Sequence, residues 1–481
     1  MSPESRIVET HVSTLMFVDD LVYKRKKAVH TGFLDFTEPA ARLTACRREV
    51  ELNRRLSPDV YLGVADLTLD GLDLDHFVVM RRLPEQRRLS ARLDAASIDD
   101  DLRSLAHQIA AFHASAQRSP EIDAAARPEA LLGLWTDGIA QLAPFTPELL
   151  DPAEVERALV LAREYLEGRR RLLDDRVDAQ RICDGHGDLI ADDVFILDDG
   201  PRVLDCIEFD DRLRYGDVLS DVAFLAMDLE RLGRADLGAR FLDEYREFTA
   251  DAWPASLAHH YLAYRAHIRA KVACIRHGQD HDADAARAAA ALHRQCVSHL
   301  ESARVWLSIV GGSPGTGKTS LARGLAERTG AVLLSSDAVR DELFPERCDR
   351  NETIGSGRYA PPRVDAVYEE MARRAEVLLE RGCRVVLDAS WLDPARRDTA
   401  RDLTRRTTSP LHELRCDCPL EMATARVGAR LAQGTDASEA TPDVARLLAD
   451  TAPPWPEAVT VDTSADLDSA IEHACSVVAT S

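Results

Sequence analysis

Residues 312–319, Gly-Ser-Pro-Gly-Thr-Gly-Lys-Thr, constrain the fold of this chain more than any other feature. They match the pattern G-x-x-x-x-G-K-(S/T), follow the apolar run VWLSIV and precede LARGLAERTG, a helical stretch that ends in a glycine. Glycines let main-chain N–H groups converge on phosphate oxygens, and the N-terminus of the following helix adds its dipole. The pattern therefore predicts a P-loop that binds a nucleotide within an α/β domain.

Side-chain chemistry predicts the roles within this loop. The Lys318 ammonium reaches the β- and γ-phosphates, and the Thr319 hydroxyl is a ligand of Mg²⁺. ATP and Mg²⁺ are therefore the expected ligands. The residues predicted to contact them are Gly312, Ser313, Gly315, Thr316, Gly317, Lys318, Thr319 and Ser320.

The chain after this loop alternates strands with helices. The apolar runs AVLLSS, RVVLDAS and LHELRC are separated by helical stretches, which indicates βαβ units and a parallel sheet. Because the pattern changes near residue 300, we place one domain at 1–300 and an α/β P-loop domain at 301–481. A chain of 481 residues is too long for one ordinary core, which agrees with two domains.

Two aspartates lie at the ends of predicted strands in the second domain. Asp337 follows LLSS, where it can accept a proton from an attacking hydroxyl; the alternative is a helix N-cap. Arg340 lies one helical turn further and can bind a phosphate. Asp388 ends RVVLD and is expected to hold the water shell of the metal.

Several arginines of this domain can close over the phosphates. Arg426 and Arg430 lie four residues apart on one predicted helix face, and Arg396 and Arg397 follow the Asp-Pro pair. Solvated surface is the alternative interpretation of all four.

The second domain resembles the small P-loop kinases of the polynucleotide kinase, gluconate kinase and zeta-toxin group. SPGTGKTSLARGLAE, SSDAVRDELF and VVLDASW carry this resemblance, which covers about 175 residues. In that group the Asp of a D-x-x-R pair is the base toward the accepting hydroxyl. The resemblance thus implies a catalytic role for Asp337 and a phosphate-binding role for Arg340.

A second group of acidic residues lies in CDGHGDLIADDVFILDDGPRVLDCIEFDD, residues 183–211. Asp188 lies in the first predicted loop, Asp193 follows five residues later, and Asp205 ends the apolar run RVLD. Phosphoryl transfer needs such a set, with one carboxylate beside the accepting hydroxyl and two metal ligands against the phosphates. An acidic surface hairpin is the alternative, but it does not explain apolar runs that end in acids.

The first domain resembles the aminoglycoside phosphotransferase family, relatives of the protein kinases. HGDLIADD, VLDCIEF and YGDVLSDVAFLAMDLE carry this likeness, which extends over roughly 300 residues. It implies an α+β protein-kinase-like fold, with Asp188 as the catalytic base and Asp205 as a Mg²⁺ ligand. Asp193 holds the position of a metal-binding Asn.

The same resemblance implies a phosphate-binding lysine in VYKRKK. Lys24 and Lys26 share one strand face, and the V-x-K spacing favours Lys24. Glu49 is the implied partner that orients the lysine, and a glutamate on the helix surface is the alternative. The pairing of both halves, with VYLGV, FLDF, MRRLPE and CIEFDDRLR, resembles bifunctional proteins labelled aminoglycoside phosphotransferase/ATP-binding protein.

Three departures from the family pattern matter. Asp193 adds a negative charge where the family has Asn. The hairpin THVSTLMFVDD has no glycine that can lie over the phosphates. In this fold the helical region after residue 217 sets the acceptor, and its sequence does not identify one.

The charge of the chain, its apolar runs and its cysteines indicate which partners and which cellular location to expect. With 60 Lys+Arg and 82 Asp+Glu, the net charge of −22 disfavours a general nucleic-acid binder. The sequence shows neither a secretory signal nor an apolar run long enough for a membrane helix, so we expect a cytoplasmic protein. The cysteines lack paired CxxC units, and Cys416 and Cys418 are predicted to be small core residues.

The leading hypothesis is an ATP-dependent phosphotransferase with two nucleotide sites and a small hydroxylated or amino-sugar-like acceptor. One alternative is a nucleotide-sensing regulator in which one kinase half is degenerate. Another is a nucleic-acid end kinase, which the basic stretch ARRDTARDLTRR (395–406) favours and the charge of −22 opposes. The sequence does not indicate the oligomeric state.

Overall fold

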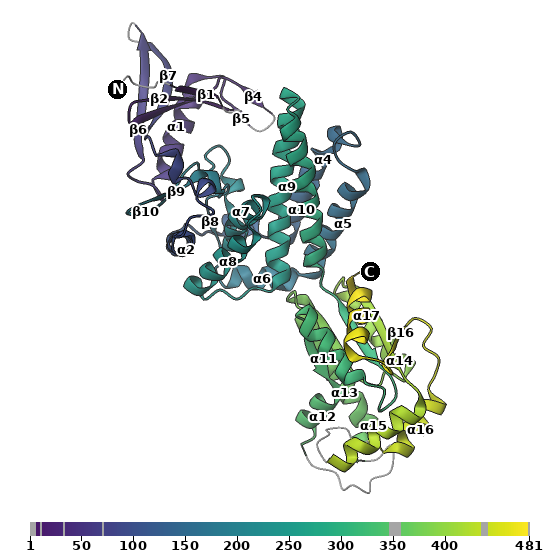
Figure 1. The fold of residues 1–481 in the computed structure, drawn as a ribbon. Coiled ribbons are helices and arrows are strands. Elements are labelled where there is room, and N and C mark those ends of the chain that lie inside the picture. Colours follow the sequence, from purple (N-terminus) through teal and green to yellow (C-terminus); the bar gives the residue numbers. More distant parts are fainter. Residues whose placement is uncertain are drawn as a thin grey trace. The chain divides into compact units, whose positions relative to one another are not determined.

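The computed structural model describes residues 6–9, 12–31, 34–69, 72–345, 357–433 and 441–479 (Figure 1). The chain divides into two compact units. The first comprises 1–159, 173–253 and 258–300, and the second comprises 160–172, 254–257 and 301–481. The units are therefore not continuous in sequence, because two short segments from before residue 300 belong to the second.

The first unit begins with an antiparallel sheet in the order β1-β2-β3-β7-β6. Its strands are β1 (Arg6–Glu9), β2 (Ser13–Val18), β3 (Leu21–Lys26), β6 (Tyr61–Leu69) and β7 (Leu72–Arg81). Strands β2 and β3 form a hairpin through Asp19 and Asp20, with Asp19 in the left-handed region (φ 52°). Helix α1 (Pro39–Asn53) packs on the sheet through Cys46 and Val50.

Helices and three short strand pairs form most of the remainder of this part of the chain. The helices are α2 (Ile98–Ser115), α3 (Pro120–Ala125), α4 (Pro128–Ala140), α5 (Pro152–Gly168), α6 (Arg170–Asp178), α7 (Val218–Arg231), α8 (Ala235–Thr249), α9 (Ala255–Asp280) and α10 (Ala283–Ala303). The strand pairs are β4 (His30–Thr31) with β5 (Leu34–Asp35), β8 (Ile182–Asp184) with β11 (Tyr215–Asp217), and β9 (Val194–Leu197) with β10 (Gly200–Val203). A small sheet followed by helices confirms the α+β kinase-like fold.

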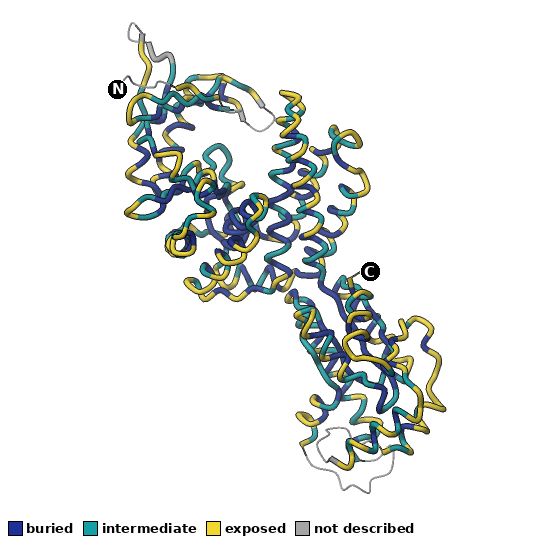
Figure 2. Tube along the Cα trace, in the orientation of Figure 1, coloured by how far each residue is buried: buried dark blue, intermediate teal, exposed yellow. Residues whose placement is uncertain are grey.

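Helix α7 lies at the centre of this unit. Every residue from Val218 to Leu229 is buried, and Figure 2 shows α7 dark along its length. Two of these buried residues, Asp221 and Asp228, are charged and accept hydrogen bonds from main-chain N–H groups of the loop after β8. The helix therefore anchors that loop.

The second unit contains a parallel sheet in the order β13-β14-β12-β15-β16. Its strands are β12 (Leu307–Gly311), β13 (Val332–Ser335), β14 (Val385–Asp388), β15 (Leu411–Asp417) and β16 (Val459–Asp462). Its helices are α11 (Lys318–Thr329), α12 (Ser336–Leu343), α13 (Pro361–Glu380), α14 (Pro394–Arg406), α15 (Leu420–Gln433), α16 (Pro442–Thr451) and α17 (Leu467–Ala479). The predicted α/β fold with a parallel sheet is confirmed.

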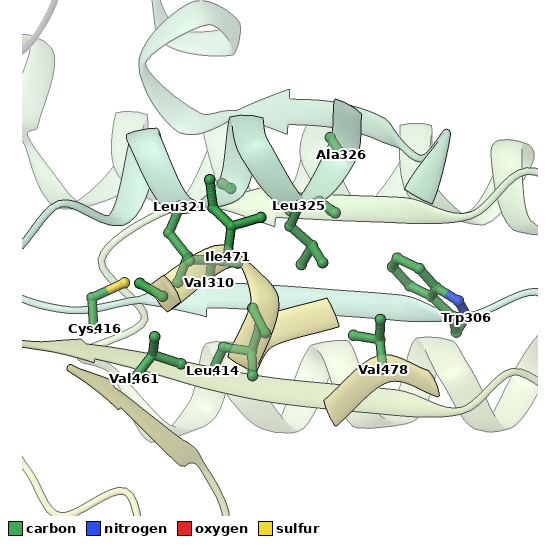
Figure 3. Packing of buried hydrophobic residues seen from close by; sticks show 14 residues of the cluster. Trp306, Val310, Leu321, Leu325, Ala326, Leu414, Cys416, Val461, Ile471 and Val478 are labelled. Atoms are coloured by element: carbon green, nitrogen blue, oxygen red, sulfur yellow. The ribbon is translucent and has the colours of Figure 1, made fainter. Parts of the chain in front are cut away.

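Helices α11 and α17 cover one face of this sheet (Figure 3). Leu321 and Ile471 from the helices meet Val310 and Leu414 from the strands. Cys416 is buried in this core, as predicted, whereas Cys418 is only partly buried and its sulfur contacts Arg426, so the prediction was wrong for Cys418. None of the helices in the described ranges is long and apolar enough to cross a membrane.

Candidate active sites

The loop after β8 carries Asp188 and is fixed from α7. The Asp221 carboxylate accepts hydrogen bonds from the main-chain N–H groups of His186 (2.7 Å) and Gly187 (2.8 Å). His113 Nε2 lies 3.0 Å from the same carboxylate. The main chain immediately before Asp188 is thereby held in one conformation.

The pKa of the Asp188 carboxyl suits a general base. Burial raises the pKa of its carboxyl to about 6, even though the nearby Arg269 and Arg265 guanidinium groups favour the charged form. A base is most effective when its pKa lies near the working pH.

Asp193 lies within the electrostatic influence of both Asp205 and Asp188. Burial, followed by the charges of Asp205 and Asp188, raises the pKa of the Asp193 carboxyl well above its usual value. Asp205 has a φ of 63° and its main-chain N–H donates to Tyr61 Oη at 3.1 Å. A non-glycine residue with positive φ costs about 1–3 kcal/mol and is typical of functional sites.

This carboxylate set fits Mg²⁺. Mg²⁺ binds through one or two carboxylates and completes its shell with water and phosphate oxygens. The described residues hold no group of three or more His, Cys, Asp or Glu side chains arranged to bind a metal by themselves, so nucleotide phosphates would supply further ligands. The Asp205 side chain is 49% exposed and accessible to such a complex.

The two candidate lysines of β3 share one glutamate. Lys24 Nζ lies 2.9 Å from Glu49 Oε1 and contacts Asp205, while Lys26 Nζ lies 2.6 Å from Glu49 Oε2 and contacts Glu208. Glu49 is fully buried, so the alternative of a helix-surface glutamate is wrong. The Lys24 side chain is 11% exposed and meets Asp205, whereas that of Lys26 is 1% exposed.

Lys24→Met and Lys26→Met are expected to have different effects. Lys26→Met leaves Glu49 and Glu208 short of a cation in the interior, so the free energy of unfolding of the first unit should fall by about 3–5 kcal/mol. Lys24→Met should mainly weaken nucleotide binding and cost less stability. Urea denaturation and nucleotide titration of both variants measure this. A larger stability loss for Lys24→Met, with unchanged nucleotide affinity, would reverse the assignment.

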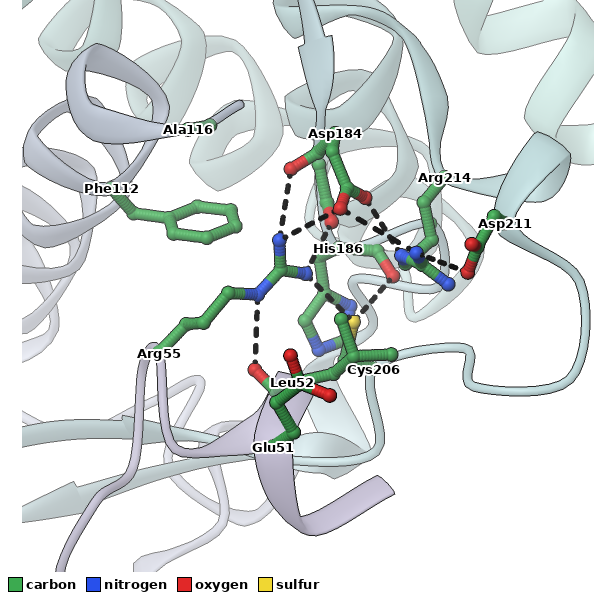
Figure 4. A network of polar contacts seen from close by, with 12 residues as sticks. Glu51, Leu52, Arg55, Phe112, Ala116, Asp184, His186, Cys206, Asp211 and Arg214 are labelled. Carbon is green, nitrogen blue, oxygen red and sulfur yellow. Dashed lines mark hydrogen bonds and ion pairs between the residues drawn. The ribbon is translucent and has the colours of Figure 1, made fainter. Parts of the chain in front are cut away.

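A polar network behind the loop involves residues that the sequence analysis missed (Figure 4). Arg55 donates to the carbonyl oxygens of Asp184 (3.1 Å) and Gly185 (2.8 Å), and its guanidinium lies 5.0 Å from the Phe112 ring. Arg214 Nε donates to Asp184 Oδ1 at 2.7 Å. Arg55 therefore ties the end of α1 to the loop that leads to Asp188, and no motif in the sequence marks it.

The P-loop has the backbone that its glycines predict. Gly312, Gly315 and Gly317 have φ values of 141°, 86° and 86°. A Cβ atom on Gly315 would lie 2.2 Å from the carbonyl oxygen of Ala423, so a side chain does not fit there. The Thr316 hydroxyl donates to the carbonyl oxygen of Ser313 at 2.8 Å, which closes the loop. The loop therefore has the form of an anion cradle.

Helix α11 begins at Lys318, directly after this cradle. Lys318 and Thr319 are partly buried in its first turn, whereas Ser320 is exposed. The free N–H groups of this first turn and the helix dipole favour an anion at this end.

Asp388 ends β14 beside the P-loop. The carboxyl is 2% exposed, and its Oδ1 has no hydrogen-bond partner among the residues that the structure describes. Burial raises the pKa of Asp388, while Lys318 and the hydroxyl groups of Thr319 and Ser335 favour its charged form. An unpaired buried carboxylate oxygen next to Thr319 fits a Mg²⁺ site that those two residues would share.

Asp337 and Arg340 form a pair on α12. The N-cap of this helix is Ser335, whose hydroxyl accepts from the main-chain N–H of Asp337, so the N-cap alternative for Asp337 is wrong. Arg340 donates to the Asp337 carboxylate, and its guanidinium lies 4.6 Å from the Tyr359 ring. Arg340 Nε has no partner among the described residues.

The other predicted arginines differ in position. A Cβ atom on Gly317 would lie 3.7 Å from Arg426 Nη1, so Arg426 lies at the P-loop. Arg430 lies one turn further along α15 and is partly buried. Arg396 pairs with Asp365 at 3.0 Å, and Arg397 donates to the carbonyl oxygen of Pro454 at 3.2 Å. Arg396 and Arg397 are thus engaged within the protein.

Comparisons with known proteins find matches for two separate parts of the chain. Residues 18–259 match the phosphotransferase enzyme family, and residues 307–454 match an AAA domain family. An uncharacterized protein of Mycobacterium tuberculosis is 39% identical over 470 residues, which cover 97% of this chain and 94% of the relative. A protein of Mycobacterium bovis is similar to the same extent.

Each of the solved structures below resembles only a part of this chain. A choline kinase from Cryptosporidium parvum is 10% identical, with 62% of this chain and 88% of that chain covered and a TM-score of 0.41. A gluconokinase from Sinorhizobium meliloti is 18% identical, with 36% of this chain and 91% of that chain covered and a TM-score of 0.26. Scores this low carry no functional argument.

Proposed function

The chain belongs to the phosphotransferase enzyme family, and from that premise we propose that it is an ATP-dependent phosphotransferase with two nucleotide sites, one in each unit. One observation carries the proposal for the first site. Lys24, which is distant in sequence from the aspartates, contacts Asp205, and the charges of Asp205, Asp188 and Lys24 all act on the Asp193 carboxyl. In the second unit, the proposal is supported by the P-loop and by Asp388, on which Lys318 and Thr319 of that loop act.

At the first site each group has a distinct role. Asp188 accepts the proton of the acceptor hydroxyl, Lys24 binds the nucleotide phosphates, and Glu49 orients Lys24. Asp193 and Asp205 would hold Mg²⁺, which neutralises charge on the phosphates. Asp221 positions the loop by binding its main-chain N–H groups.

At the second site the main chain of the P-loop and Lys318 bind the phosphates, and Thr319 with Asp388 would hold Mg²⁺. Asp337 is the base toward a second acceptor or toward water, and Arg340, which donates a hydrogen bond to this carboxylate, binds a phosphate. Arg426 lies where it can bind the phosphates from the other side of the loop.

We further propose a small hydroxylated metabolite as the acceptor of the first site and the cytoplasm as the location. A reducing compartment is supported by the cysteines in the described ranges, since Cys46, Cys183, Cys206, Cys274, Cys296, Cys383, Cys416, Cys418 and Cys475 are all free.

A nucleotide-sensing regulator is the second candidate. The ion pair between Lys24 and Asp205 favours it, because both partners must separate before they bind a Mg²⁺–nucleotide complex. The nucleic-acid end kinase hypothesis loses support, because Arg396, Arg397 and Arg401 of its basic stretch are all engaged within the protein.

Incubation of the full chain with labelled ATP and a metabolite extract tests the proposal. Mass spectrometry should detect a phosphorylated product that disappears with Asp188→Asn and persists with Lys318→Ala. Nucleotide binding without any phosphorylated product would support the regulator instead.

The activity of the first site is expected to depend on pH through Asp188. The base must be ionised, and its pKa is raised to about 6, so protonation removes activity as the pH falls through this value. The kcat/KM of the Lys318→Ala protein should therefore fall about tenfold per pH unit below about pH 6 and level off above about pH 7. A profile that stays flat down to pH 5 would contradict the role of Asp188.

A further inference from the structure

Helix α9 is cationic in an acidic protein. Its sequence, ASLAHHYLAYRAHIRAKVACIRHGQD, contains four Lys or Arg residues and one Asp, whereas the whole chain has a net charge of −22. Two of these cations, Arg265 and Arg269, lie four residues apart and hence on one face of the helix. The charges of both act on the Asp188 carboxylate and favour its ionised form.

Arg265 fixes this face of α9 against the loop that carries Asp188. Its Nη1 donates to the carbonyl oxygen of Gly187 at 3.1 Å, and its Nε donates to that of Ser220 at 3.0 Å. Its guanidinium also lies 4.9 Å from the Phe224 ring. Arg265 is buried, and these contacts leave it little capacity for a ligand.

Arg269 lies one turn further along the same face and differs from Arg265. It is partly buried, and within the described residues its side chain has neither a hydrogen bond nor an ion pair. Other arginines near the site are engaged: Arg55 and Arg214 bind Asp184, and Arg231 binds Asp228. A guanidinium with free donors beside the base is therefore available to a ligand.

Different cationic residues act on the three aspartates of the first site. The strongest cationic neighbours of Asp193 are Lys24 and Arg88, and those of Asp205 are Lys24 and Lys26. Arg269 and Arg265 are instead the strongest cationic neighbours of Asp188. Arg269 thus lies on the face of α9 that Arg265 holds against the loop of Asp188, whereas Lys24 contacts Asp205, the predicted Mg²⁺ ligand.

We propose that Arg269 binds a carboxylate or phosphate group of the acceptor, so that the first site phosphorylates an anionic hydroxylated metabolite and not a cationic amino sugar. Arg suits this role because its planar guanidinium can form two parallel hydrogen bonds to such a group. An acceptor ammonium group at the same place would be repelled. The inference rests on the proposed function of the first site.

The reaction is an ordinary phosphoryl transfer. The acceptor hydroxyl gives its proton to Asp188, and its oxygen forms a bond with the γ-phosphorus of ATP. The bond between the γ-phosphorus and the oxygen that bridges to the β-phosphorus breaks, which releases ADP. Arg269 takes no part in these bond changes and is a specificity residue.

The charge of the acceptor can be tested without knowing its identity. A metabolite extract is separated at pH 7 by ion exchange into anionic, neutral and cationic pools, and each pool is incubated with labelled ATP and Lys318→Ala protein. Product that depends on Asp188 is expected from the anionic pool alone. Such product from the neutral or cationic pool instead would overturn the inference and leave the proposed function standing. No such product from any pool would overturn the proposed function.

Arg269→Gln tests the residue itself on the anionic pool component that is phosphorylated. Loss of a charge-assisted hydrogen bond should raise the KM for this acceptor by about 10–100-fold, with a much smaller change in kcat, and Arg269→Lys should restore part of the loss. Arg276→Gln on the same helix is the matched control, since that side chain is 67% exposed and pairs with Asp282. An unchanged KM in Arg269→Gln would refute the role of Arg269.

Discussion

Asp188→Asn is expected to lower phosphoryl transfer at the first site by about 10²–10⁴-fold, the usual contribution of a general base. Asparagine keeps the size of the side chain but cannot accept the proton of the acceptor hydroxyl. The loop should keep its shape, because Asp221 holds it through the main chain of His186 and Gly187. Nucleotide affinity should therefore stay close to that of the parent protein.

Initial rates in the Lys318→Ala background isolate this effect from the second site. Asp198→Asn is the control, because that side chain is 87% exposed and pairs with Arg87 at the surface. Turnover should be unchanged in the control. Retention of full acceptor turnover in Asp188→Asn would remove Asp188 from the mechanism.

Lys318→Ala is expected to weaken nucleotide binding at the second site by about 10–100-fold, because it removes charge-assisted hydrogen bonds to the β- and γ-phosphates. The change leaves the glycine conformations of the P-loop in place, so the fold of the second unit should persist. Isothermal titration of the full chain in the Lys24→Met background, in which the first site is weakened, measures the affinity.

Arg323→Ala on the same helix is the matched control for Lys318→Ala. Arg323 is exposed on α11 and lies away from the phosphate-binding turn. It should bind nucleotide like the parent protein. Equal losses in both variants would show that the helix, and not the Lys318 ammonium, determines the affinity.

The sequence predicts those parts of the sites that are local in the chain. The P-loop was predictable because Gly315 and Gly317 are needed for its backbone, and the strand before it and the helix after it are continuous with it. Asp188, Asp193 and Asp205 lie within one short stretch, so their likeness to a known family was visible without knowledge of the packing.

Other parts depend on tertiary packing and leave no local signal. The sharing of Glu49 between Lys24 and Lys26 requires knowledge of how α1 lies on the sheet. Arg55 and Arg269 resemble any other arginine in sequence, and only the packing of α1 and α9 brings them near the loop of Asp188. The acceptor side of the site could not be predicted for the same reason.

The number of nucleotide molecules bound per chain tests the central claim most directly. Titration of the full chain with a non-hydrolysable ATP analogue and Mg²⁺ should give two molecules bound per chain. Lys318→Ala should remove one of them, and Asp205→Asn the other. A single molecule in the parent protein, or the loss of both in either variant, would contradict an account based on two separate phosphotransferase sites.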